Sequence, residues 1–225
     1  MTITFRALGA LLSYPTPELL AALPEIGAVI EADKRLGRRE KAAVRLLVGE
    51  LAGADLLDAQ ERYVVVFDRG RATSLHLFEH VHGDSRDRGT AMLDLRGVYE
   101  AAGFAFTANE LPDYVPAVLE FLSTQPFAKA EEMLGDCAHI LRAIGEALDR
   151  RSSPYAALFA ALLAMVNAQG LAAATREPPS AQDKPLDEEW VDEPVIFGPA
   201  GAPGSCGAAR PQTSVIQFMP PATPR

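Results

Sequence analysis

Apolar residues recur three or four positions apart along most of the first 175 residues, which is the spacing of helices that bury one face. The segment 127–151 is the clearest example. Ser152, Ser153 and Pro154 then predict a new helix start, with a hydroxyl cap followed by proline at the first helical position, leading into 155–169. The stripe of 127–151 consists of Met133, Leu134, Cys137, Ile140, Leu141, Ile144 and Leu148.

Similar patterns predict further helices upstream. Thr16-Pro17-Glu18 begins one of them, after Pro15 has ended the first. Val64–Val66 is the only stretch with strand character, but the helical spacing continues through it, so we expect a helix there too. The fold class is therefore all-α, a bundle of about eight or nine helices. The remaining predicted helices are 57–68, 85–103 and 113–125.

Proline and glycine placement divides the chain near residue 175. We expect one helical domain, 1–175, followed by a Pro/Gly-rich and mostly irregular tail, 176–225. Within the tail, acidic residues surround Trp190, the only tryptophan. Such a segment can dock on the body or on a partner; we expect 186–198 to be ordered against the body and 199–225 to be loose.

Charge and composition exclude several classes of protein. The net charge of −9 argues against nucleic acid and suits a basic partner. We find neither an apolar run long enough to cross a bilayer nor an export signal, so we expect a cytoplasmic protein without a transmembrane segment. Cys137 and Cys206 form no C-x-x-C motif, so any redox metal is expected to belong to a partner.

The stretch 73–89 contains three of the four histidines. His76-Leu-Phe-Glu79-His80 has the H-x-x-E-H spacing of inverted zinc peptidases, in which a helix presents both histidines on one face. No second motif supplies the third ligand that such a site needs. A zinc-dependent hydrolase using these three residues is nevertheless the enzymatic alternative.

A purely structural interpretation also accounts for most of this stretch. Thr73 or Ser74 would cap a helix with Leu75, Phe78 and Val81 on its buried face. Its last turn would contain His80 and His82, which interact favourably with the helix dipole when protonated, and Gly83 would end it.

Arg86 and Arg88 need a separate explanation. They fall in the first turn of the following helix, which Asp84 or Ser85 can cap, and cations are disfavoured there by up to about 1 kcal/mol. Pairing with Asp84, Asp87 or Glu79 is the ordinary explanation, and binding of a partner's carboxylate or phosphate is the functional one.

Several stretches together resemble one known family. They are 6-RALGALLSYPTPEL-19, 61-ERYVVVFDRGRATSLHLFEHVHGDSRDRGTAMLDL-95, 110-ELPDYVPAVLEFLS-123, the helical region after 127, and 186-LDEEWVDEPVIFG-198. The series resembles the NarJ-type nitrate reductase molybdenum cofactor assembly chaperones, and the resemblance covers most of residues 5–198.

The resemblance implies a helical chaperone rather than an enzyme, with no cofactor of its own. Such a chaperone binds the unfinished catalytic subunit of respiratory nitrate reductase and holds it competent for insertion of the molybdenum cofactor. It also helps to prevent premature membrane docking and is absent from the finished enzyme. We expect the N-terminal segment of the catalytic subunit to be the binding partner, with cofactor delivery proteins as further candidates. A chaperone or scaffold for another molybdoenzyme is the alternative within this class.

A chaperone of this kind needs an apolar groove with a polar rim, in which an amphipathic helix can lie. Taken singly, most of the apolar residues of the series are better explained as ordinary core, so the rim is the stronger candidate. Asp113 can cap the helix that follows it, and Tyr114 places a polar tip near the surface. The candidate lining is Tyr63, Phe67, Leu77, Phe78, Met92, Leu95 and Tyr99, and the candidate rim is Asp68, His76, Glu79, His80, His82, Asp84, Arg86, Arg88, Glu110 and Asp113.

Overall fold

The computed structural model describes residues 2–82, 86–104 and 110–172, except for the side chain of Arg86. These residues contain ten α-helices and one short 3-10 helix, and they confirm the predicted all-α class. The helices belong to one compact unit, Met1–Pro178. They are α1 (Ile3–Leu11), α2 (Pro17–Ala32), α3 (Arg38–Gly53), α4 (Leu56–Phe67), η1 (Arg71–Thr73), α5 (Leu77–His82), α6 (Arg86–Ala101), α7 (Val115–Thr124), α8 (Phe127–Asp136), α9 (Ala138–Arg150) and α10 (Ala156–Met165).

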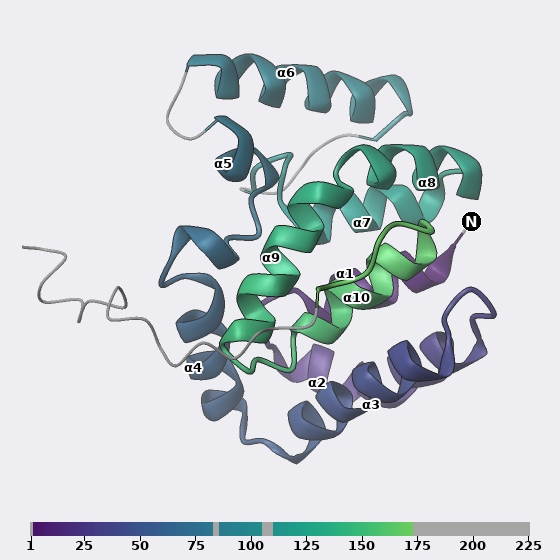
Figure 1. The fold of residues 1–225 in the computed structure, drawn as a ribbon, viewed down its shortest axis with the longest axis vertical. Helices are drawn as coiled ribbons and strands as arrows, with labels where there is room; N and C mark the ends of the chain where they lie inside the picture. The colour runs from purple at the N-terminus through teal and green to yellow at the C-terminus, as the bar shows by residue number, and fades with distance from the viewer. Residues whose placement is uncertain (1, 83–85, 105–109, 173–225) are drawn as a thin grey trace, which may run out of the picture. The chain divides into compact units, whose positions relative to one another are not determined.

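The core is centred on α1 and α10. Helix α1 packs against α7 and α2, while α10 packs against α9 and α3 (Figure 1). The sequence of α10, AALFAALLAM, is apolar on every face, so this helix is stable only when surrounded by others. Gly9 lets α1 approach α7 closely, because a Cβ atom there would lie 3.2 Å from Leu119 Cβ and from the Pro116 carbonyl oxygen.

One predicted helix cap is confirmed and another is wrong, although the helix expected after the second cap is present. Thr16 caps α2 by accepting a hydrogen bond from the Leu19 amide at 3.2 Å, with Pro17 at the first helical position. Ser153 caps nothing, and α10 begins only at Ala156. Instead, Ser152 takes a left-handed conformation (φ 53°), and its own amide and that of Ser153 bond back to Asp149 and Leu148 at 2.9 Å. The two serines therefore end α9 in a Schellman motif.

The predicted helix 127–151 is two helices, α8 and α9, separated at Cys137. Most of the predicted stripe is nevertheless buried, including Leu134, Ile140 and Ile144. The break escapes the apolar pattern because the backbone of Cys137 (φ −91°, ψ 0°) stays close to helical, so the three-and-four spacing continues across it.

A short backbone pairing joins two distant segments beside the helices. His76 and Tyr114 form an isolated antiparallel bridge, in which the Val115 amide donates to the Leu75 carbonyl at 2.9 Å and the Leu77 amide to the Asp113 carbonyl at 3.2 Å. Leu75 and Leu77 are both buried, with His76 between them half-buried. The expected helical face is therefore wrong: α5 begins at Leu77, and Val81 is 53% exposed.

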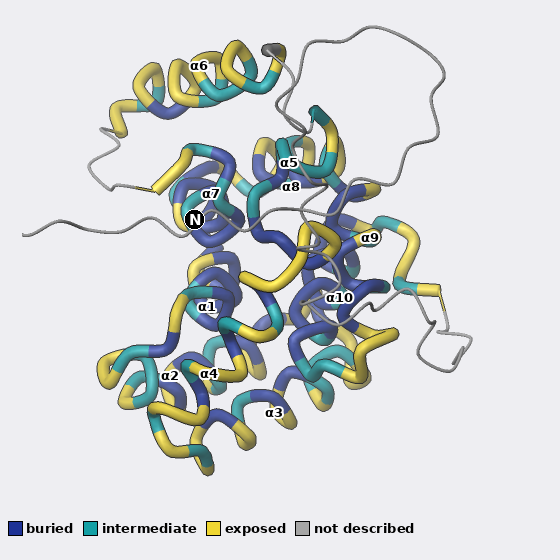
Figure 2. The backbone as a smooth tube through the Cα atoms, turned by 90° about the vertical axis from the view of Figure 1, so that its left-hand side faces the viewer, coloured by how far each residue is buried: buried dark blue, intermediate teal, exposed yellow. Residues whose placement is uncertain are grey.

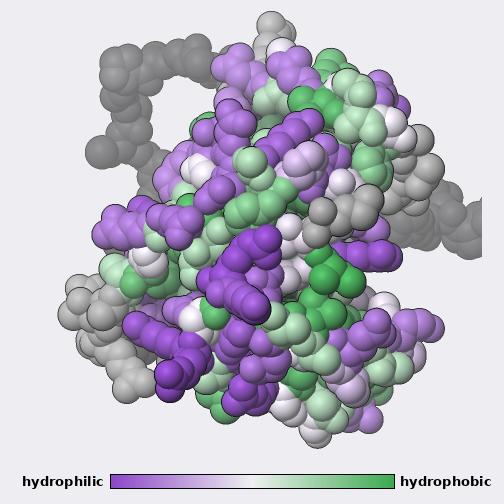
Figure 3. Space-filling view, turned by 90° about the vertical axis from the view of Figure 1, so that its right-hand side faces the viewer, coloured by the Kyte–Doolittle hydropathy of each residue, from purple (hydrophilic) through white to green (hydrophobic). Residues whose placement is uncertain are grey.

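Helix α6 is held much more loosely than the central helices. Much of α6 is coloured as exposed in Figure 2. Tyr99 is the only buried side chain among those described in α6, and Leu93 is 70% exposed. On the face drawn in Figure 3, hydrophobic residues lie in small groups between hydrophilic ones. None of the helices in the described ranges is long and apolar enough to span a bilayer. The predicted tail 176–225, including the segment 186–198 and Cys206, lies outside the described residues.

Candidate functional site

Two adjoining pockets form a groove along the described body. The first has a volume of about 710 Å³ and lies among α4, the segment 68–76, α5 and α6. The second, of about 730 Å³, lies among α1, α7 and the end of α6. Tyr14, Glu110 and Tyr114 line both pockets and mark the boundary between them.

Aromatic rings form the floor where the two pockets meet. Tyr63 and Phe67 project from successive turns of α4 with ring centroids 4.8 Å apart, and the Tyr14 ring meets Tyr63 edge-on at 5.6 Å. The Tyr63 hydroxyl donates to the Leu12 carbonyl at 2.8 Å and lies 3.0 Å from the Tyr114 hydroxyl. Tyrosine is neutral at physiological pH, and burial raises the pKa of both Tyr63 and Tyr114 further.

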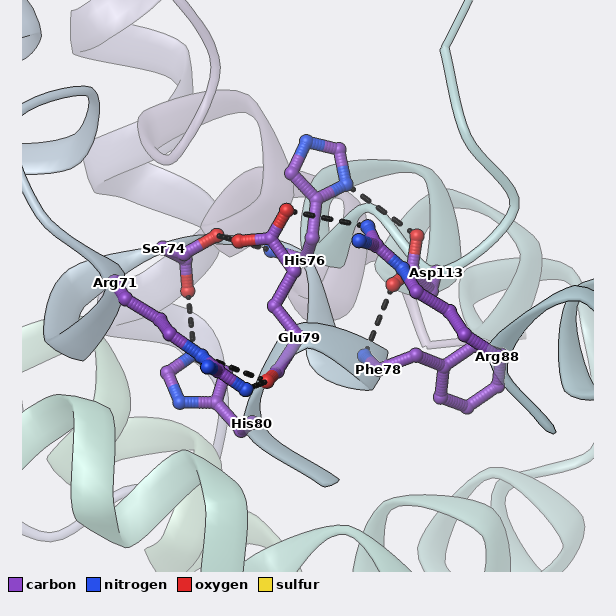
Figure 4. A network of polar contacts seen from close by, with 8 residues as sticks. All are labelled: Arg71, Ser74, His76, Phe78, Glu79, His80, Arg88 and Asp113. Atoms are coloured by element: carbon purple, nitrogen blue, oxygen red, sulfur yellow. Dashed lines mark hydrogen bonds and ion pairs between the residues drawn. The ribbon is translucent and has the colours of Figure 1, made fainter. Parts of the chain in front are cut away.

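Asp113 is the buried centre of a polar network beside the first pocket. Its side chain is fully buried; Oδ2 accepts the Phe78 amide at 2.9 Å, and Oδ1 lies 3.3 Å from His76 Nδ1 (Figure 4). The prediction that Asp113 caps its own helix is wrong, because α7 begins at Val115 without a side-chain cap. The bridge between His76 and Tyr114 instead turns Asp113 toward the start of α5, which it caps.

Glu79 is the second centre of this network. Its carboxylate accepts the Ser74 hydroxyl at 2.6 Å and pairs with Arg88 at 3.1 Å. The guanidinium of Arg71 donates to the Glu79 backbone carbonyl, and His80 Nε2 lies 2.9 Å from the Ser74 carbonyl. Pairing with an acid of the same stretch therefore explains Arg88, because this cation in the first turn of α6 ties α6 to Glu79 of α5.

The hydrogen bond to Asp113 raises the pKa of His76, more than burial lowers it. His76 therefore gains its positive charge at a higher pH than a free histidine. Because His76 lines the first pocket, that charge is added to the rim of the groove.

The geometry does not support the zinc hydrolase alternative. His76 precedes α5, so it and His80 are not one turn apart on a helix, and their rings point toward different partners (Figure 4). Ser74 and Arg88 already bind the Glu79 carboxylate. Within the described ranges no three side chains of the metal-ligating types come together.

About half of the predicted site residues line the first pocket. Phe78, His80, His82 and Met92 are half-buried outside both pockets, and Asp113 lies beneath the first one. The predicted lining residue Leu77 is instead core, and Leu95 packs against the core. Asp84 and the side chain of Arg86 lie outside the described residues. Those lining the first pocket are Tyr63, Phe67, Asp68, His76, Glu79, Arg88, Glu110 and Tyr114, while Tyr99 lines the second.

The sequence pattern does not predict most residues of the second pocket, nor some residues of the first. The family resemblance could have identified Tyr14 as a site residue, since Tyr14 lies in the stretch 6–19 that supports it. Arg71 and Ser74 occur in a polar run with no periodicity to mark them. The wall of the second pocket includes Gly9 and Ala10, and small residues on an apolar helix give no sequence signal for a hollow.

An all-helical body with an aromatic-floored, polar-rimmed groove has the form expected of an α-helical binding protein. Its residues 31–161 match the family model described as nitrate reductase delta subunit. The chain belongs to that family.

Relatives in two bacteria agree with this assignment. The chain is 42% identical to the nitrate reductase molybdenum cofactor assembly chaperone NarJ of Escherichia coli (strain K12), over 83% of this chain and 81% of the relative. It is 38% identical to the probable chaperone of the same description, NarW, of that strain, over 85% and 82%. Identity to the probable NarJ of Bacillus subtilis (strain 168) is 35%, over 75% and 91%.

Proposed function

We propose that this chain is a maturation chaperone for respiratory nitrate reductase that carries out no catalytic turnover. It binds the apo catalytic subunit in the cytoplasm, holds it competent for molybdenum cofactor insertion and membrane assembly, and leaves before the enzyme is complete. The cofactor belongs to the client. The observation that carries this proposal is the 42% identity, over most of both chains, to a relative named as an assembly chaperone.

The groove suits an amphipathic helix of the client, and we propose the N-terminal segment of the catalytic subunit as that helix. Its apolar face would lie on the rings of Tyr14, Tyr63 and Phe67 and extend into the second pocket toward Phe121. The exposed acids Asp68 and Glu110 at the rim favour a basic segment, as does the net charge of −9.

Isothermal titration with a synthetic peptide of that N-terminal segment tests the proposal. We expect saturable one-to-one binding, weaker at pH 6 than at pH 8, because protonated His76 adds positive charge to a rim that attracts a basic peptide. Tyr14→Ala is expected to weaken binding by about tenfold, as for an aromatic residue at the centre of an interface. Leu93→Ala, an exposed apolar truncation outside both pockets, is the matched control and should bind normally.

A second pair of variants examines the rim. Arg88 and Arg96 both lie on α6 and each pairs with a glutamate, but only Arg88 lines a pocket. Arg88→Ala removes a positive charge from the rim and frees the Glu79 carboxylate, so it should raise the affinity for a basic peptide, while Arg96→Ala should not change it. Both variants should leave helicity nearly unchanged. Equal affinities for the two variants would remove Arg88 from the site.

The identity of the client is tested by recovering the intact subunit from cells that express the tagged chain. We expect the catalytic subunit of nitrate reductase. Preferential recovery of the corresponding subunit of a dimethyl sulfoxide or formate enzyme would contradict the client assignment. Absence of peptide binding at either pH would refute the N-terminal segment alone, provided that the intact subunit is still recovered.

A further inference from the structure

A third pocket, of about 260 Å³, uses a different face of α4 from the groove. It lies where α3, α4 and the link between α9 and α10 come together. Most of its wall is apolar, and Val65 presents a side chain that is 42% exposed at this surface. Its lining is Leu47, Glu50, Leu51, Ala59, Arg62, Val65, Val66, Arg151, Ser153, Pro154 and Tyr155.

The rim of this pocket has an excess of positive charge. Arg62 and Arg151 are both exposed, and Glu50 is the one acid of the lining. Among the described residues, Arg62 donates to the Asp58 backbone carbonyl at 3.2 Å, and Arg151 donates to the Thr73 hydroxyl at 3.3 Å. Neither arginine forms an ion pair with a carboxylate of the described ranges, so both can bind an acidic ligand.

Ser153 supplies an independent sign that a ligand is accommodated here. Its hydroxyl oxygen is buried and has no hydrogen-bond partner among the described residues. Because Ser152 and Ser153 end α9 rather than cap α10, the fold gives this hydroxyl no internal role. An unpaired buried hydroxyl is costly, and a ligand carrying a polar group would satisfy it.

We propose that the acidic segment 186–198 of the same chain binds this third pocket, with Trp190 as its apolar anchor. The segment contains five acids (Asp187, Glu188, Glu189, Asp192 and Glu193) and no base. It therefore complements Arg62 and Arg151, while a large ring flanked by carboxylates suits an apolar pocket with a basic rim. This inference does not depend on the identity of the client.

The chain between Ala172 and the segment 186–198 is long enough for that segment to reach the third pocket. The last described residue, Ala172, bonds through its amide to Glu146 of α9 at 3.2 Å. Arg151, just past the end of the same helix, lies about 8 Å further along the axis at 1.5 Å per residue. Residues 173–185 can span up to about 45 Å when extended, so reach does not limit docking.

Fluorescence of the full-length chain tests the proposal, because Trp190 is its only tryptophan. In the native chain we expect emission shifted to shorter wavelength than in the urea-unfolded chain, together with protection from acrylamide quenching. Val65→Asp, and separately the pair Arg62→Glu and Arg151→Glu, should shift emission toward the unfolded value and remove the protection. All three positions are exposed, so the folded body should survive, as circular dichroism would verify.

Two control variants separate the third pocket from general surface effects. Leu46→Asp changes an exposed apolar residue of α3 outside the pocket, and Arg69→Glu changes an exposed arginine outside it; both should leave Trp190 protected. The proposal fails if Trp190 is as exposed in the native chain as in urea, or if its protection survives the pocket variants. Protection that rises with protein concentration would place the segment on a second copy and also overturn it.

Discussion

Helices α1 and α6 are stabilised in different ways. Helix α1 buries two thirds of its nine residues, among them Phe5, Leu8 and Leu11, against α7 and α10. Helix α6 is longer, but its described attachments to the rest of the body are few. Arg88 pairs with Glu79, Leu95 packs against the core, and Tyr99 packs on Phe121 and donates to the Pro112 carbonyl. Apolar burial thus fixes the centre of the fold, whereas a few polar and aromatic contacts hold the wall of the groove. Substitutions should affect the two regions differently.

The largest effect is expected from Leu8→Ala. Leu8 is completely buried in α1, so truncation should lower the free energy of unfolding by about 3 kcal/mol through lost burial and a residual cavity. Urea denaturation measures the change. Leu93→Ala on α6 is the matched control and should cost less than about 0.5 kcal/mol. Similar losses at the two sites would contradict the contrast between the helices.

Asp113→Ala should have the next largest effect, about 2 kcal/mol, because it leaves the Phe78 amide without its cap and removes the partner of His76. Asp113→Asn keeps an acceptor for the amide, so it should cost less. Urea denaturation of both variants, with helicity followed by circular dichroism, makes the comparison. An alanine variant as stable as the native chain would show that the network does not hold α5 in place.

Tyr99→Phe should cost about 1 kcal/mol, since it removes the 2.7 Å hydrogen bond to the Pro112 carbonyl but keeps the ring on Phe121. We expect this loss to loosen α6 specifically. Limited proteolysis should then cut α6 faster while leaving α1 unchanged. Equal acceleration at both helices would mean that Tyr99 supports the whole fold.

The smallest effect is a pH dependence from His76. Its pKa is raised in the folded chain by Asp113, so its contribution to stability is complete below about pH 6.5, the usual histidine value, and is lost as the pH rises through the folded pKa. For one partly exposed ion pair we expect less than about 1 kcal/mol. Urea denaturation from pH 5.5 to 8.5 should show this decline in the native chain and a smaller one in His76→Gln.

The apolar pattern along the sequence predicts the core residues well and the helix caps poorly. Ile140, Leu141, Ile144 and Leu148 were predicted on one stripe and are buried together, because a helix's own period sets which face meets its neighbours. The same pattern passed over the break at Cys137, where the backbone hardly departs from helical values.

Contacts between residues far apart in the chain explain the remaining errors. Asp113 looked like the cap of its own helix, but it serves an amide 35 positions earlier. His76 and His80 looked like one helical face, but the pairing of His76 with Tyr114 keeps His76 out of the helix. Residues found through the family resemblance, such as Tyr63, Glu79 and Tyr114, do meet in one pocket, although their role in binding is still a prediction.

The pairing of His76 with Tyr114 also affects how the chain opens. Helices α5 and α6 come between the two paired segments in the chain, and the bonds between Leu75 and Val115 and between Leu77 and Asp113 hold those segments side by side. We expect α6 to unfold and refold while this pairing stays intact, because Tyr99 is the only buried side chain among those described in the helix. We therefore expect the amide hydrogens of α6 to exchange with solvent through local opening, at a lower free energy than those of α1, which require the whole domain to unfold.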